Sequence, residues 1–526
     1  MIALAGPLLL VALVCARVDA RSTTSPHAHV FLAQELVLVA GAALVAGAAV
    51  IAKLRVRRDA ITLAVASLAA LEIASLAGAR DPWLALRSAS VWLSGLAVFV
   101  VARSLDRQRR DAAIAALLVP LTVVAGSVVL EALGHVHLSA RHHAPGGLLG
   151  ERNVAGELLV AGAPAIAYTC LADGRAWRRR VAHGVLALAA CALVLTRTRS
   201  AWLAALVVSG LLVVVTTMRA VRAARAGHED VAMRGRFARL VGAGVIGVAI
   251  ALLLPTTLRW RSAQPYRDSL VHLVDRSTPS ASGRLVQYAT TWRMATANPA
   301  LGVGAGNWAA QYVSYAERGD RTIRGGLSPV NRLPNSDLLG FAAERGLIAL
   351  AVLGYLGLLV ARRGGPSGSL RTLRQATLLA VAIMAALDAV LQTPAALLLV
   401  AWVLGTCSAS NVRERAASAP FANIEPRWSR LALASFALVL AAVSVPAATR
   451  IASLKLASRA RGSDDLDRAA RLDPGDVGLR LLAAESWIAD GRCDRARSHL
   501  DAVTRFSPAS PALGELTERC ATLSSR

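Results

Sequence analysis

The sequence predicts an all-α polytopic membrane protein with about 12–13 transmembrane helices. Hydrophobic residues make up 55% of the 526 residues and charged residues only 17%, whereas soluble domains carry about 25% charge and about 45–50% apolar residues. The charges are also segregated into short clusters, separated by apolar runs of about 17–23 residues that are long enough to cross a bilayer as helix. This pattern excludes a soluble enzyme and a disordered protein.

The net charge of +25 results from 58 Lys and Arg against 33 Asp and Glu. In a soluble chain this excess would indicate nucleic acid as a partner. Here the arginines flank apolar runs, as in membrane proteins whose cytoplasmic loops are basic. No basic patch is interleaved with aromatic residues in the manner of a nucleic-acid groove. The predicted partner is therefore the bilayer, and nucleic acid is not expected.

Thirteen apolar runs follow one another along the chain. The first lacks a basic n-region, which favours a retained helix, although a signal peptide cleaved after Ala20 is the alternative. Either choice leaves the topology of the other spans unchanged. The predicted spans lie near residues 2–18, 30–52, 60–79, 84–102, 112–134, 154–172, 181–196, 201–217, 239–258, 338–360, 376–391, 394–410 and 429–448.

Every second loop between these spans is basic, which predicts their orientation. Each basic loop holds at least four Lys or Arg, and the short loops between them hold one or two or none. The basic loops are expected to face the cytoplasm, so the long loop and the C-terminal tail face outward. The basic loops are 53–59, 103–111, 173–180, 218–239, 361–375 and 411–430.

The spans divide the chain into five parts. Residues 1–29 form the first span or signal-like segment, 30–258 hold spans 2–9, and 338–448 hold spans 10–13. Residues 259–337 form a large external loop, and 449–526 form an external helical tail. Loops as long as this one are usually functional or disordered.

An amphipathic helix is predicted at 283–297 in the long loop. Ser282 is the expected N-cap, and Asn298-Pro299 ends the helix. An apolar stripe that includes Trp292 predicts that the helix lies on the outer membrane surface.

The tail resembles a tetratricopeptide repeat. Leu472-Asp473-Pro474 and Phe506-Ser507-Pro508 recur 34 residues apart, which is the period of that repeat. One repeat is short for independent stability, so the tail is expected to dock on the membrane domain or on a partner. Cys493 and Cys520 both lie there, and the external compartment permits a disulfide without requiring it.

Two external arginine clusters are candidates for anion binding. Arg197 and Arg199 occupy the tight link 196–200 between two spans, on a side where basic residues are otherwise rare. They either snorkel at the interface or bind an anion such as a lipid headgroup or a diphosphate. Arg284 is expected in the first turn of the external helix, where free N–H groups attract anions. Arg293 should point to the opposite face.

Two carboxylates enter the tenth span. Asp337, Phe341 and Glu344 fall on one helix face, and acids in a membrane helix need a partner or a wet cavity. Asp337 is expected to cap the helix, and Glu344 to pair with an arginine across the bundle.

Neither a metal nor a nucleotide cofactor is expected. The histidines near the fifth span have no cysteine nearby and lie in a Gly/Pro-rich stretch, which disfavours a metal site. The glycines of 302–306 follow no strand, so they are interpreted as a flexible turn rather than a dinucleotide site. The histidines are His135, His137, His142 and His143.

Three motifs carry a resemblance to the O-antigen ligase/O-antigen polymerase superfamily of bacterial membrane glycosyltransferases. The second motif is the most specific, and a large external loop after nine spans also fits the family. Glu151-Arg152-Asn153 fits a family asparagine. The motifs are Leu195-Thr-Arg-Thr-Arg-Ser-Ala-Trp202, Gly283-Arg284 with Asn298-Pro-Ala-Leu-Gly-Val-Gly-Ala-Gly-Asn-Trp308, and Asn335-Ser-Asp-Leu338 with Ala343-Glu-Arg-Gly-Leu347.

The resemblance implies transfer of a glycan from a polyprenyl-diphosphate carrier to a lipid, polysaccharide or protein acceptor. The reaction would take place at the periplasmic face of the bacterial inner membrane, without metal or nucleotide sugar. By resemblance Arg199 and Arg284, with Arg197, hold the diphosphate, and they stabilise it as the leaving group. Asn153 and Glu344 would support the site.

One position departs from the family, whose histidine falls at Asn335. Asparagine cannot accept a proton near neutral pH. Asp337 takes over, or leaving-group stabilisation suffices, or the chain is a non-catalytic lipid-linked glycan binding or transport protein of the same fold. An ion-coupled transporter is disfavoured, because no inverted repeat is evident and Glu72, Glu344 and Asp388 form no chain.

Overall fold

The computed structural model describes residues 2–17, 28–54, 56, 59–140, 143–172, 175–225, 231–258, 260, 262, 264–271, 279–324, 326–327, 329–362, 368–408 and 426–524. Within these ranges the chain forms helices and no strand, which confirms the predicted all-α class. His142 and most of the predicted basic loop 411–430 lie outside the described residues.

Each predicted span coincides with a helix. Ten segments of the described chain are long and apolar enough to cross a membrane. They comprise α2 (Ala28–Ile51), α4 (Pro82–Arg103), α5 with α6 (Arg107–Ala115, Leu118–Ala132), α7 (Arg152–Leu171), α8 (Ala176–Thr196), α9 (Arg199–Arg225), α10 (Val231–Leu253), α14 (Asp337–Arg362), α15 (Gly368–Leu387) and α18 (Pro426–Ser458).

Three further apolar helices are shorter, and they pack into the same bundle: α1 (Ile2–Cys15), α3 (Ala60–Ala74) and α16 (Pro394–Cys407). Every residue of α16 is buried, so this helix runs through the interior of the bundle. The helices α9 and α10 instead expose many large apolar side chains, as expected where a helix faces lipid rather than protein.

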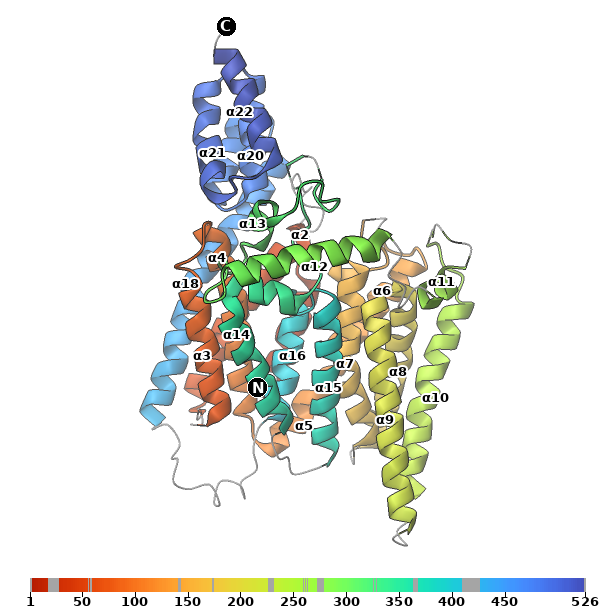
Figure 1. The fold of residues 1–526 in the computed structure, drawn as a ribbon. Helices are drawn as coiled ribbons and strands as arrows, with labels where there is room; N and C mark the ends of the chain where they lie inside the picture. Colours follow the sequence, from red (N-terminus) through yellow and green to blue (C-terminus); the bar gives the residue numbers. More distant parts are fainter. Residues whose placement is uncertain are drawn as a thin grey trace.

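The remaining helices gather at one end of the bundle, which we call the loop face (Figure 1). They are α11 (Pro265–Val271), α12 (Pro279–Ala297), α13 (Trp308–Tyr315) and the tail helices α19 (Ser463–Leu472), α20 (Val477–Ala489), α21 (Cys493–Phe506) and α22 (Pro511–Ser524). The helix α12 lies across the ends of the upright helices. The long loop and the tail therefore share one face, as the charge pattern predicted.

The start of α12 differs from the prediction. The helix begins at Pro279, so Ser282 lies inside it rather than at its cap, and Arg284 lies beyond the first turn. Proline suits a first helical position because its missing N–H would have no partner there. The buried side of α12 carries polar residues such as Gln287, whereas Trp292 is 48% exposed. Leu285 and Trp292 of the apolar stripe thus face outward, whereas Ala295 is buried, and contact with the membrane surface stays a prediction.

The glycine-rich stretch 302–306 is a tightly packed clasp, not a flexible turn. It lies against a break in α14 at Gly346, whose φ of 86° is left-handed. The Leu347 N–H donates to the Pro299 carbonyl, and the Val303 N–H donates to the Ala343 carbonyl, both at 2.8 Å. A Cβ on Gly302 would lie 2.2 Å from the Glu344 backbone. The second and third sequence motifs are therefore joined by backbone hydrogen bonds and close packing.

A buried ion-pair network lies beneath this clasp. Arg345 is 1% exposed, donates to Glu344 at 2.6 Å and pairs across the bundle with Glu72 of α3. The expectation for Glu344 is thus corrected: its arginine is the adjacent residue, and the contact across the bundle is made by that arginine. Arg345 also stacks on Trp92 and Phe341. One buried guanidinium thus pairs with two buried carboxylates, and Oε2 of Glu72 has no hydrogen-bond partner among the described residues.

The tail docks on the loop face. The Gln311 side chain donates to the Phe506 carbonyl, and the Ser507 hydroxyl donates to the Ala310 carbonyl, both at 2.8 Å. Cys493 and Cys520 form a disulfide, with Cα atoms 5.5 Å apart. Docking on the membrane domain was one of two expectations for this tail, and its assignment to the tetratricopeptide repeats stays a prediction.

Candidate functional site

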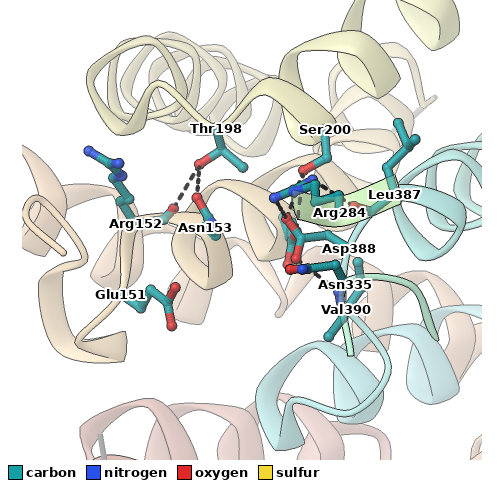
Figure 2. Close-up of polar contacts among 12 residues, drawn as sticks. Glu151, Arg152, Asn153, Thr198, Ser200, Arg284, Asn335, Leu387, Asp388 and Val390 are labelled. Carbon is teal, nitrogen blue, oxygen red and sulfur yellow. Dashed lines mark hydrogen bonds and ion pairs between the residues drawn. The ribbon is translucent and has the colours of Figure 1, made fainter. Parts of the chain in front are cut away.

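A polar cavity of about 130 Å³ lies at the loop face, where four distant segments of the chain meet (Figure 2). The segments are the start of α7, the α8–α9 turn, α12 and the end of α15. The cavity wall carries several arginines and a carboxylate. Its lining residues are Arg152, Asn153, Arg197, Thr198, Arg199, Ser200, Arg284 and Asp388.

The α8–α9 turn is fixed against α7 by close backbone packing. Arg197 ends α8 with a φ of 53°, in the left-handed region. The Thr198 hydroxyl donates to the Arg152 carbonyl at 3.1 Å and lies 3.5 Å from Asn153 Oδ1. Gly156 permits this approach, since a Cβ there would lie 2.9 Å from the Thr198 hydroxyl. The turn therefore presents its arginines from a rigid position.

Arg284 reaches from α12 to the end of α15. Its Nη1 donates to the Leu387 carbonyl at 2.8 Å, and its Nη2 lies 3.3 Å from Asp388 Oδ2. The Tyr288 hydroxyl, one turn further along, donates to the Asn335 carbonyl at 3.0 Å, and it lies 3.4 Å from the Leu387 carbonyl. Burial raises the pKa of Tyr288, so this phenol stays protonated. These contacts bring Asn335 next to the Arg284–Asp388 pair.

Asp388 is the carboxylate in the cavity wall. Its side chain is 13% exposed, and Oδ2 lies 3.5 Å from the Ser200 hydroxyl. That hydroxyl also lies 3.4 Å from Oε1 of Glu157, a buried acid of α7. The sequence placed Asp388 among the membrane acids and gave it no role. Its spacing from Arg284 carries no local signal, so only the tertiary contact reveals it.

Asp337 does not line this cavity and is held by backbone contacts. Its Oδ2 accepts the N–H groups of Val390 and Leu391 at 2.7 and 2.6 Å, and the residue is 3% exposed. Asp337 is the first residue of α14 and anchors the segment that follows α15, so it neither caps its own helix nor lines the cavity. Asp337 is not among the lining residues, and the expectation that it replaces the histidine stays a prediction.

Glu151 lies beside the cavity, at the N-terminus of α7. Burial raises its pKa to about 7, the charge of Asp388 adds to this rise, and Arg152 opposes it. The His143 Nδ1 atom lies 3.8 Å from its carboxylate. Glu151 therefore changes charge near neutral pH at the edge of the site.

A family model described as O-antigen ligase matches residues 184–354. The chain carries an O-antigen ligase domain. This match confirms the resemblance to the O-antigen ligase/polymerase superfamily that the motifs indicated, and a comparison with curated proteins finds no match. The family indicates a membrane enzyme of the glycosyltransferase-like ligase or polymerase type that works on lipid-linked glycans.

The O-antigen ligase domain supplies part of the cavity. Arg197, Arg199 and Arg284 lie inside the matched residues, and all three line the cavity. Asn153 also lines the cavity from outside the match. Glu344 belongs to the clasp instead. Arg152 and Asp388 complete the wall, and sequence reasoning assigned neither of them to the site.

Proposed function

We propose that this O-antigen ligase domain protein transfers a glycan from a polyprenyl-diphosphate carrier to an acceptor hydroxyl at the loop face. The observation that carries the proposal is the gathering of four arginines and one carboxylate around a single cavity. Guanidinium groups match phosphate oxygens with paired donors. A carboxylate beside them can accept the proton that the acceptor hydroxyl must lose.

Arg199 and Arg284 would bind the diphosphate and stabilise it as a leaving group. As the bond between the anomeric carbon and the phosphate oxygen breaks, its electron pair stays on the phosphate. The developing charge lies where Arg199 and Arg284 can interact with it. Donors fixed before the reaction are effective because they need no rearrangement as the charge develops.

Asp388 is the best-placed proton acceptor. The acceptor oxygen forms a bond to the anomeric carbon, and its proton passes to Asp388. Asn335 can orient the hydroxyl by hydrogen bonding but cannot take the proton. A diphosphate that binds Arg284 competes with Asp388 for the same guanidinium, which would free the carboxylate as the donor arrives. Asp337, the earlier candidate, would act only by holding the segment after Asp388.

The reaction would take place at the periplasmic side of the bacterial inner membrane. Basic loops lie on the opposite side of the sequence-derived topology, and such loops face the cytoplasm. The acceptor class, whether lipid A-core, polysaccharide or protein, is left to experiment. No metal or nucleotide cofactor enters this scheme.

A strain lacking the protein would supply the test. Its membranes contain the unused lipid-linked donor and the acceptor, and purified protein in lipid nanodiscs should transfer the glycan when it is added to these solubilised membranes. Arg284→Gln should lower the rate about a hundredfold, because a lost contact to the developing charge costs about 3 kcal/mol. Arg293→Gln is the matched control, since Arg293 lies on the same helix and pairs with the exposed Glu317.

The same assay separates the non-catalytic alternative, which Asn335 at the family's histidine position favours. A binding or transport protein would retain the lipid-linked donor in the nanodisc and release no transferred product. Equal rates for wild type, Arg284→Gln and Arg293→Gln would remove Arg284 from the site.

A further inference from the structure

The cavity has a second cationic end that the proposed transfer does not use. In Figure 2 the guanidinium of Arg152 lies far from the Arg284–Asp388 pair, with Thr198 and Asn153 between them. The guanidinium carbon of Arg197 lies 4.5 Å from the centre of the Trp260 ring, and that of Arg152 lies 5.5 Å from it. Two arginines therefore share one tryptophan as a platform.

Both guanidinium groups have N–H donors that are available to a ligand. Arg197 donates from Nε to the Ser269 hydroxyl at 2.9 Å, and within the described part of the chain the terminal nitrogens of Arg197 and Arg152 have no hydrogen-bond acceptor. The Trp260 indole N–H is buried there without a partner as well. Glu151 and Asp268 act on these arginines only through longer-range electrostatics. A buried indole N–H without an acceptor, beside two guanidinium groups that line the cavity, indicates a site for an anionic ligand.

The charge of the cavity wall exceeds that of a diphosphate. The lining residues include four arginines and one aspartate. A diphosphate esterified at both ends carries about one negative charge on each phosphate, since esterification removes the ionisation near pH 6. Among the lining residues about one positive charge is then left over, and the neighbouring Glu151 and Asp268 compensate it only from a longer distance. This charge lies at the Trp260 end if the diphosphate occupies Arg199 and Arg284.

The backbone of Arg197 supports a built site. A residue other than glycine in the left-handed region costs of order 1–3 kcal/mol and persists only where the surroundings impose it. Here that conformation accompanies the stacking of Arg197 on Trp260. An arginine at this position therefore destabilises the turn, as expected when the side chain is needed for binding.

We propose that Arg152, Arg197 and Trp260 form a subsite for a carboxylate-bearing sugar of the glycan donor, a uronic acid adjacent to the diphosphate. This inference rests on the proposed function and specifies its substrate class. The planar carboxylate matches the paired N–H groups of a guanidinium. The indole N–H can donate to the same carboxylate or to a ring hydroxyl.

Three synthetic probes test the subsite with full-length protein in nanodiscs: polyprenyl diphosphate without sugar, the same carrier with glucose, and the same carrier with glucuronic acid. Wild type should bind the glucuronic acid probe about tenfold more tightly than the glucose probe. Arg152→Gln and Arg197→Gly should both remove this preference, and Arg152→Gln should leave binding of the sugar-free carrier unchanged. Arg197→Gly also controls for folding, because glycine adopts a left-handed φ without strain.

The remaining outcomes of the binding experiment distinguish failure of the subsite from failure of the proposed function. Equal affinity of wild type for the two sugar probes overturns the subsite. A loss of sugar-free carrier binding in Arg197→Gly assigns that arginine to the diphosphate and also overturns it. Arg284→Gln should weaken all three probes, whereas Arg293→Gln should change none. If wild type binds no probe at all, the lipid-linked donor itself is wrong and the proposed function fails with the subsite.

Discussion

Asp337 and Asp388 lie on two segments joined by a backbone hydrogen bond, in which the Asp337 N–H donates to the Asp388 carbonyl at 3.0 Å. The Asp337 carboxylate is occupied by two backbone N–H groups of the segment that follows Asp388. The Asp388 carboxylate faces Arg284 and Ser200 in the cavity. One aspartate thus holds the backbone of the other segment, and the other aspartate faces the cavity.

Exchanging each acid for its amide separates these two roles. Asp388→Asn should lower the transfer rate by about 10²–10⁴-fold, the usual contribution of a positioned base. Asp337→Asn keeps a carbonyl oxygen that can accept the same N–H groups, so the rate should stay within about tenfold of wild type. Initial rates and thermal unfolding of both variants provide the measurement. A large rate loss in Asp337→Asn with unchanged unfolding would return the catalytic role to Asp337.

The arginines of the site were predictable and its acid was not. Arg197, Arg199 and Arg284 lie within recognisable motifs, on a side of the membrane where basic residues are rare. Asp388 follows an ordinary apolar run, and its partner Arg284 is 104 residues away in the chain. No local periodicity links two residues at such a separation, so their contact depends on the packing of α12 across α15.

At the scale of elements, the clasp between the glycine-rich stretch and α14 sets the position of the segment that carries Asn335 and Asp337. Hydropathy predicted α14 as one span, because an apolar run does not reveal a single residue with left-handed φ. The break at Gly346 and its fit against Ala300 depend on two segments that the pattern treats separately. The start of α12 was also predicted wrongly. Pro279 and Ser282 both suit the beginning of a helix, so the local sequence does not decide between them.

Gly346→Ala tests the clasp. Its left-handed φ is costly for alanine, and the new Cβ would lie 2.3 Å from the Ala300 carbonyl oxygen. The variant should unfold at a lower temperature, with a loss of about 1–3 kcal/mol or more. Gly354→Ala is the control in the same helix, because a Cβ there meets nothing within 4 Å. Equal unfolding temperatures for the two variants in detergent would mean that the clasp accommodates the new Cβ without a loss of stability.

For the molecule as a whole, buried acids connect the tail to the membrane domain. Asp81 caps α4, and Gly475 of the tail packs so closely that a Cβ there would lie 3.2 Å from the Asp81 carboxylate. Burial raises the pKa of Asp81 to about 6, and the nearby Asp473 of the tail adds to this rise. Burial likewise raises the pKa of Asp473 to about 6.

The stability of the docked tail should therefore depend on pH. Because the folded-state pKa of Asp81 exceeds its ordinary value of 3.8, the folded protein binds more protons than the unfolded chain between about pH 4 and 6. The free energy of unfolding contributed by Asp81 then rises as the pH falls through this window. Asp81→Asn, which still caps the helix, should unfold at a higher temperature than wild type at pH 7.5, and the difference should shrink below pH 6 and vanish below about pH 4. Parallel pH curves for the two proteins would contradict this.

The direction in which the whole molecule faces the membrane determines which pool of substrate it can reach. A lipid-linked glycan displayed outside the cytoplasm is available to the cavity only if the loop face is external. In a Cys15→Ser background, Arg318→Cys and Glu515→Cys introduce exposed thiols on the loop and the tail, while Arg225→Cys introduces one at the far end of α9. The first two should react with an impermeant maleimide in intact spheroplasts. The third should react only after permeabilisation, because basic loops face the cytoplasm. Labelling of Arg225→Cys with protection of the other two would reverse the orientation and remove the cavity from its proposed donor.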